Sequence, residues 1–186
     1  MLETKKRVED KDKLKIQGFD VFESRREEAK KEKKGGGIAV LVKKSSGVLV
    51  KQHLPVINQP ELQYVSTERL WLTYESLQGK TALCTVYLGF NHSDERHLKW
   101  NEGNFSVLSD EIRDLRERGF RILLQGDFNC HVGSDLERGG IPGNSSQKPN
   151  KNGELFLTFL SQSSLEHLNG AVRERGNWNS KICCKV

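Results

Sequence analysis

The sequence predicts a mixed α/β domain in which two β-sheets pack together with helices on the outside. Residues 69–77 alternate with a period of two, and a turn at Gly79 leads into a further apolar strand at residues 81–90. Apolar residues then recur three and four positions apart along residues 104–119, as in an amphipathic helix. A short apolar strand at residues 121–126 follows directly, and its run Ile122-Leu123-Leu124 has the length and composition of a buried strand. Strands interrupted by a helix favour a two-sheet α/β sandwich over a simple meander.

Size and charge define the broad class of protein. The chain has 186 residues, of which 35% are hydrophobic, so it can form one core, and a single domain over residues 1–186 is expected. Charged residues make up 30% of the chain and its net charge is +5. This charge allows attraction to a polyanion, but it is lower than expected of a protein that coats nucleic acid.

The cysteines and the apolar runs predict an intracellular protein. Cys84, Cys130, Cys183 and Cys184 have neither the spacing of a zinc site nor the density of a disulfide scaffold, which fits a reducing compartment. No apolar run approaches the roughly 18 residues of a membrane span, and the N-terminus is too charged for a signal peptide. We therefore expect no membrane partner.

The N-terminal half is predicted to contain short strands. Three glycines open an apolar strand at residues 38–42. Because a strand and not a helix follows those glycines, a phosphate-binding loop is excluded. Residues 25–34 mix acids and bases and are predicted to be a charged surface segment. Residues 47–57 form a further β-rich run.

Two helices and two polar connections are predicted in the C-terminal half. Asn104 is the expected N-cap of the first helix, and residues 91–101 before it read as a polar surface loop that could hold His92, His97 and Trp100 near a substrate. Residues 133–151 form a long polar loop. The second helix follows, with a core-facing stripe of Leu155, Phe156, Phe159, Leu160 and Leu165.

The strongest candidate site follows the strand at residues 121–126. Gly126 allows the backbone to pass close to another group, and Asp127 and Asn129 lie two positions apart, so an extended segment would point them to the same side. Phe128 would then point into the core. A carboxylate beside an amide suits hydrolysis, although glycine, aspartate and asparagine also form ordinary turns. His131 is interpreted as structural.

Residues 126–129, Gly-Asp-Phe-Asn, resemble the GDFN signature of the endonuclease/exonuclease/phosphatase family, which shares the DNase I-like fold. Residues 35–42 resemble the family's GGGIAILV element, and residues 150–159 resemble its N-x-N-G-x-x-L-x-x-F helix. The residues found at these motif positions are most similar to those of non-LTR retrotransposon endonucleases, which are associated with a reverse transcriptase. The resemblance implies a four-layer α/β sandwich of DNase I-like type.

The resemblance also implies a role for each candidate site residue. Glu3, in a Leu-Glu-Thr sequence similar to the family's Q-E-T element, would ligate a divalent metal, Mg²⁺ or Mn²⁺. Asp127 would orient or deprotonate the attacking water, and Asn129 and Tyr87 would contact the phosphate. Tyr87 matches the family's V-Y-x-P element only in part, and a strand tyrosine is usually a core residue with its hydroxyl at the rim. Glu3 alone would read as a charged terminal residue.

The resemblance covers nearly all of the chain but only the middle of the family's domain. The family's first strand with its asparagine, its I-D-Y strand and its S-D-H turn have no counterpart here, so an incomplete domain is expected. Two hypotheses follow: a metal-dependent phosphodiesterase that nicks DNA, or an inactive fragment that binds nucleic acid weakly and in a salt-sensitive way. The first implies DNA as the partner, a monomer, and a nuclear location if functional.

Overall fold

The computed structural model describes residues 2–3, 14–25, 37–53, 69–89, 95–132 and 148–166, which form two β-sheets and two α-helices. The first sheet is antiparallel and has the order β1-β3-β2. Its strands are β1 (Leu2–Glu3), β2 (Phe19–Arg25) and β3 (Gly37–Lys43). A 3₁₀ turn, η1 (Lys44–Ser46), follows β3. Of the charged segment predicted at residues 25–34, Arg25 is the last residue of β2 and residues 26–34 lie outside the described residues.

The second sheet has four strands in the order β4-β5-β6-β7. Its strands are β4 (Val50–His53), β5 (Arg69–Ser76), β6 (Gly79–Tyr87) and β7 (Phe120–Asp127). The first three form an antiparallel meander, whereas β7 pairs with β6 in parallel. A parallel pair needs a crossover, and α1 (Glu95–Glu117) supplies it. The second helix, α2 (Lys151–Gln162), comes after β7.

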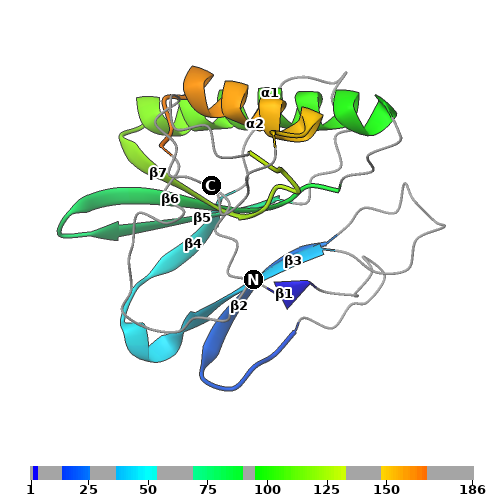
Figure 1. Cartoon of the computed structure of the whole chain (residues 1–186). Helices are drawn as coiled ribbons and strands as arrows, with labels where there is room; N and C mark the ends of the chain where they lie inside the picture. The colour runs from blue at the N-terminus through cyan, green and yellow to red at the C-terminus, as the bar shows by residue number, and fades with distance from the viewer. Residues whose placement is uncertain are drawn as a thin grey trace, which may run out of the picture.

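The molecule is layered as helices, sheet and sheet (Figure 1). Both helices lie on one face of the four-stranded sheet, and the three-stranded sheet lies on its other face. The main hydrophobic core fills the space under the helices and includes Trp71, Phe128 and Phe156. A smaller cluster around Ile38, Leu70 and Leu72 lies on strands of both sheets. The predicted two-sheet α/β sandwich is confirmed; among the described residues, helices cover one sheet, which gives three of the four layers expected.

The start of α1 differs from the prediction. The helix begins at Glu95, so residues 95–101, expected to be a loop, are helical, and Asn104 is an interior residue and not the N-cap. Asn104 is buried and its side-chain amide donates to the Trp100 carbonyl 3.0 Å away. The inward face of this first part carries the buried amides of Asn101 and Asn104, so the apolar repeat that marks a helix is missing there.

The apolar run in β7 is only partly buried. Leu124 is 1% exposed, whereas Leu123 is 39% exposed, because successive side chains of a strand point to opposite faces. The expectation of a strand buried over Ile122, Leu123 and Leu124 is therefore wrong for Leu123. Phe128, just after the strand, is fully buried as expected. Across the described part of the chain, no helix is long and apolar enough to span a bilayer.

A buried ion pair joins α1 to β5. Arg69 donates from Nε to Glu111 Oε2 over 2.8 Å, and Trp71 Nε1 donates to the same oxygen, also over 2.8 Å. All three side chains are buried. The Glu111 carboxylate accepts from two residues, Arg69 and Trp71, on one face of β5. It therefore fixes both where α1 lies along the sheet and how far α1 lies from the sheet.

Removing one partner of this pair is expected to destabilise the fold strongly. Glu111→Gln leaves the Arg69 charge buried without its counter-ion, and the free energy of unfolding should fall by about 3 kcal/mol. The control is Asp114→Asn, which breaks the exposed pair with Arg118. This variant should change the free energy of unfolding by less than about 1 kcal/mol. Urea unfolding of the three proteins measures both values, and equal losses in the two variants would contradict the prediction.

Candidate functional site

The candidate site lies where the two parallel strands end. In the pairing of β6 with β7, Tyr87 is the partner of Asp127, the last residue of each strand. Partners in register share a face of the sheet, so the phenol and the carboxylate start from neighbouring positions on the same side. The pairing continues one step further, since the Leu88 N–H donates to the Asp127 carbonyl over 2.9 Å.

Gly126 makes this close pairing possible. Its φ is +141°, a backbone conformation that other residues rarely adopt. A Cβ atom at this position would lie 2.8 Å from both the carbonyl carbon and the nitrogen of Val86, and closer still to the Val86 oxygen. The backbone of β7 therefore passes β6 at a distance that only glycine allows. The close approach expected of Gly126 is confirmed.

Asp127 and Asn129 are held by a tight turn and not by an extended segment. The Asn129 N–H donates to Asp127 Oδ1 over 2.9 Å, which is the bond of an Asx turn. Asn129 has a φ of +49°, in the left-handed region that asparagine tolerates better than most residues. Its side-chain Nδ2 donates to the Leu88 carbonyl, directly after Tyr87. The expected extended segment is wrong: a turn, and not strand alternation, sets the direction of the Asn129 side chain, which reaches the end of β6.

Several oxygens at the site are left available for a ligand. Asp127 Oδ1 accepts the hydrogen bond of the turn, and the side-chain nitrogen of Asn129 donates to the Leu88 carbonyl. Among the described residues, no hydrogen-bond partner is seen for Asp127 Oδ2, Asn129 Oδ1 or the Tyr87 hydroxyl. All three side chains are partly exposed. The turn therefore fixes the orientation of Asp127 and Asn129, and each keeps one side-chain oxygen without a partner among the described residues.

Glu3 belongs to the opposite sheet. Its backbone pairs with Ile38 in β3, and Ile38 belongs to the inter-sheet cluster against which Tyr87 packs. The backbone of Glu3 is thus paired directly with a member of the cluster that Tyr87 contacts. The side chain of Glu3 lies outside the described structure.

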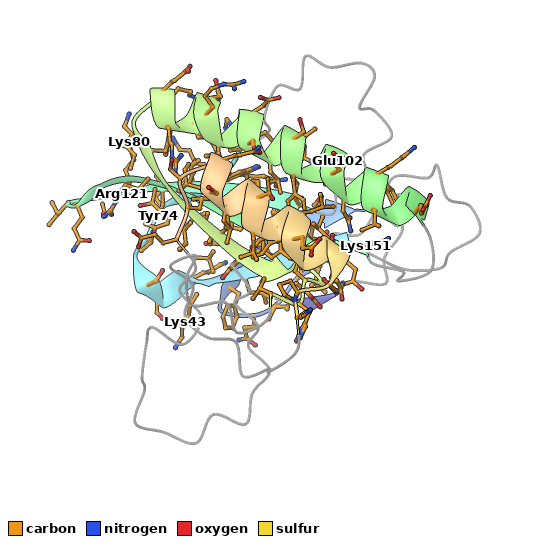
Figure 2. The ribbon with its side chains drawn as sticks, turned by 45° about the horizontal axis from the view of Figure 1, so that its top comes forward. Lys43, Tyr74, Lys80, Glu102, Arg121 and Lys151 are labelled. Carbon is orange, nitrogen blue, oxygen red and sulfur yellow. The ribbon has the colours of Figure 1, made fainter. Side chains whose placement is uncertain are left out.

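The first turn of α2 supports the segment that follows β7. Asn150, the N-cap, accepts at Oδ1 from the Gly153 N–H (2.7 Å) and from the His131 N–H (3.3 Å), and its own N–H donates to the His131 carbonyl over 3.0 Å. A Cβ on Gly153 would lie 2.8 Å from the His131 carbonyl carbon. Figure 2 shows Lys151 at one end of α2, with Lys80 and Arg121, near the starts of β6 and β7, towards the opposite end of the molecule.

Two residues that the sequence did not single out for the site are Asn101 and Asn152. Both are buried, and Asn101 Nδ2 donates to Asn152 Oδ1 over 3.1 Å. Asn152 in turn donates to the carbonyls of Phe128 and Asn129. The N-x-N-G pattern at residues 150–153 was the available signal, but it predicts the helix and not these contacts. His92, proposed for the same neighbourhood, lies outside the described residues.

The described cysteines and acids offer no second reactive centre. Burial raises the pKa of the Cys84 thiol well above its usual value, with a further contribution from Glu111, so the thiol stays protonated at neutral pH. Cys130 is also buried, and its Sγ lies 3.1 Å from the Phe128 carbonyl. Within the described ranges, no three His, Cys, Asp or Glu side chains group together as metal ligands.

Comparison with known proteins adds a structural similarity. No family model matches the chain, and no curated protein matches it significantly. Among solved structures, the endonuclease domain of TRAS1, a telomere-specific non-LTR retrotransposon, is similar with a TM-score of 0.43 and 16% sequence identity. The similarity covers 80% of this chain and 54% of that chain, so this chain spans about half the length of that domain.

Replacing Gly126 is expected to separate the two strands at the site. Gly126→Ala combines an unfavourable φ with a clash against the Val86 backbone, whereas Gly119→Ala has only the unfavourable φ (+82°) and nothing within 4 Å. We expect Gly126→Ala to lower the free energy of unfolding by about 2 kcal/mol more than Gly119→Ala does. Urea titrations of both variants measure the difference. Equal losses would mean that the strands do not approach as closely as described.

Proposed function

We propose that this chain carries the chemistry of a metal-dependent phosphodiester hydrolase, and specifically of a DNA-nicking endonuclease of the retrotransposon type. One observation carries the proposal: Tyr87 and Asp127 are partners at the ends of two parallel strands, and Asn129 is tied to the residue after Tyr87. The ends of parallel strands are where α/β sheets commonly place a ligand. The GDFN resemblance supports the same assignment.

Each group has a role that suits hydrolysis of a phosphodiester. Asp127 keeps Oδ2 available to orient a water molecule or take its proton, while Oδ1 holds the turn. The Tyr87 hydroxyl can donate to a phosphate oxygen. The Asn129 amide nitrogen is used on Leu88, so this residue would meet the phosphate group through its oxygen, by way of a water or a cation. Fixed groups of this kind need little rearrangement during the reaction.

A divalent cation fits the donors that the site presents. Mg²⁺ is commonly held by one or two carboxylates, with water and substrate phosphate completing its coordination. Glu3, from the facing sheet, is the proposed carboxylate ligand, and Asn129 Oδ1 is a further oxygen donor of the required hardness. Bound there, Mg²⁺ or Mn²⁺ would neutralise charge on the phosphate.

DNA is the substrate and partner in this proposal. The net charge of +5 favours a polyanion over a small neutral substrate, and a nuclear monomer remains the expected form. The competing hypothesis is a protein without hydrolytic activity whose binding to nucleic acid weakens steeply with salt. The two hypotheses differ in one observable, which is the cutting of a phosphodiester bond.

The test is nicking of supercoiled plasmid by the full chain and by Asp127→Asn, with Mg²⁺ and with a chelator. Asparagine keeps an oxygen that can accept the turn bond from Asn129 but removes the negative charge. We expect the wild type to nick only with Mg²⁺, and the variant to be slower by a factor of about 10² to 10⁴.

The matched control is Asp114→Asn, an exposed carboxylate on α1 that should leave nicking unchanged. Equal rates for wild type and Asp127→Asn would overturn the role of Asp127. No nicking by any of the proteins, together with salt-dependent binding to the plasmid, would replace the proposed hydrolase with the binding protein.

A further inference from the structure

The backbone carbonyls of the turn after β7 are bound by a buried side chain of α2. Asn152 Nδ2 donates to the Phe128 carbonyl over 2.9 Å and to the Asn129 carbonyl over 3.1 Å. Cys130 Sγ lies 3.3 Å from the same nitrogen. Asn152 is 0% exposed, so no water competes for these bonds. One side chain therefore holds the residues that follow Asp127.

A second buried amide extends this contact to the end of β6. Asn101 Nδ2 donates to Asn152 Oδ1 over 3.1 Å and lies 3.2 Å from the Gly89 carbonyl. Asn101 is 1% exposed and belongs to α1. The two asparagines thus connect both helices to the segments that follow Tyr87 and Asp127. Burying two amides is tolerated only because their donors and acceptors are matched.

The hydrogen bond from Asn152 is made to the carbonyl of Asn129, a residue whose backbone is in the left-handed region. Its left-handed conformation, with φ of +49°, persists only where surrounding contacts impose it. Three contacts do so: Asp127 Oδ1 on its N–H, Leu88 on its side chain, and Asn152 on its carbonyl. Of these, the contact from Asn152 alone comes from outside the two strand ends.

We propose that Asn152, supported by Asn101, is a positioning residue that fixes the orientation of Asn129 and Asp127 towards the phosphate. This proposal rests on the proposed function, since it states which residue aligns the groups of that same site. Asn152 touches the backbone of the turn and not the reacting atoms. Its loss should therefore affect turnover and leave the affinity for DNA nearly unchanged, because the charges that attract DNA stay in place.

The test compares Asn152→Ala with Asn104→Ala. Asn104 is also a buried asparagine, 5% exposed, but within the described ranges its side chain bonds to the Trp100 carbonyl of α1 and not to the turn after β7. Amide hydrogen exchange, read residue by residue by NMR, should show the Asn129 N–H exchanging about tenfold faster in Asn152→Ala than in Asn104→Ala, relative to amides of β5 in each protein. A merely structural loss of stability would raise exchange throughout the fold. If Asn152→Ala does not fold, Asn101→Ala provides the same comparison with a smaller change in the same direction.

Plasmid nicking supplies the second readout. The kcat of Asn152→Ala should fall by about 10- to 100-fold with little change in KM, whereas Asn104→Ala keeps both near wild type. Equal exchange of the Asn129 N–H in the two variants would overturn the proposal whether or not the wild type nicks DNA. An active wild type with unchanged kcat in Asn152→Ala would overturn it and leave the proposed function standing. An inactive wild type with selectively faster Asn129 exchange would support the positioning contact while the proposed function fails.

Discussion

The parallel pairing of β6 with β7 is the constraint on which the site depends. The two strands come together because Gly126 has no side chain to hold the Val86 backbone away, and α1 is the crossover that lets them run in the same direction. As a result Tyr87 and Asp127, forty residues apart in the sequence, end their strands as neighbours. The helices, the core beneath them and the Arg69–Glu111 pair all stabilise this one arrangement.

The turn after β7 shows how a strand end can present polar side chains. In an extended continuation, Asn129 would have pointed to the same side of the sheet as Asp127. The Asx turn instead reverses the chain within two residues, brings Asn129 to Leu88 and leaves oxygens of Asp127 and Asn129 without partners among the described residues. Asn152 of α2 donates to a carbonyl of the turn, and Asn101 of α1 donates to Asn152. Rigid support and unused polar atoms are what a catalytic site requires.

Much of the fold could be predicted, because most strands and helices follow from patterns of nearby residues in the sequence. Alternation predicted β5, and an apolar run after the turn at Gly79 predicted β6. The helical repeat predicted most of α1 and α2, and Gly126 marked the close approach. The first part of α1 was missed because its inward positions, including Asn101 and Asn104, are polar, and a buried amide looks like a surface residue until its partner is known. The same ambiguity concealed Asn152. Hydrogen bonds across 23 or 51 residues have no local signature.

The central claim is that Tyr87, Asp127 and Asn129 form one site for a phosphate and a divalent cation. Its most direct test is paramagnetic broadening of amide NMR signals by Mn²⁺ in the presence of a short DNA duplex with non-hydrolysable linkages. The amides of Tyr87, Asp127 and Asn129 should broaden, while those of Lys80 and Arg121, roughly 20 Å away along the same strands, stay sharp. Equal broadening at both ends of β6 and β7, or broadening confined to the Lys80 end, would contradict the account.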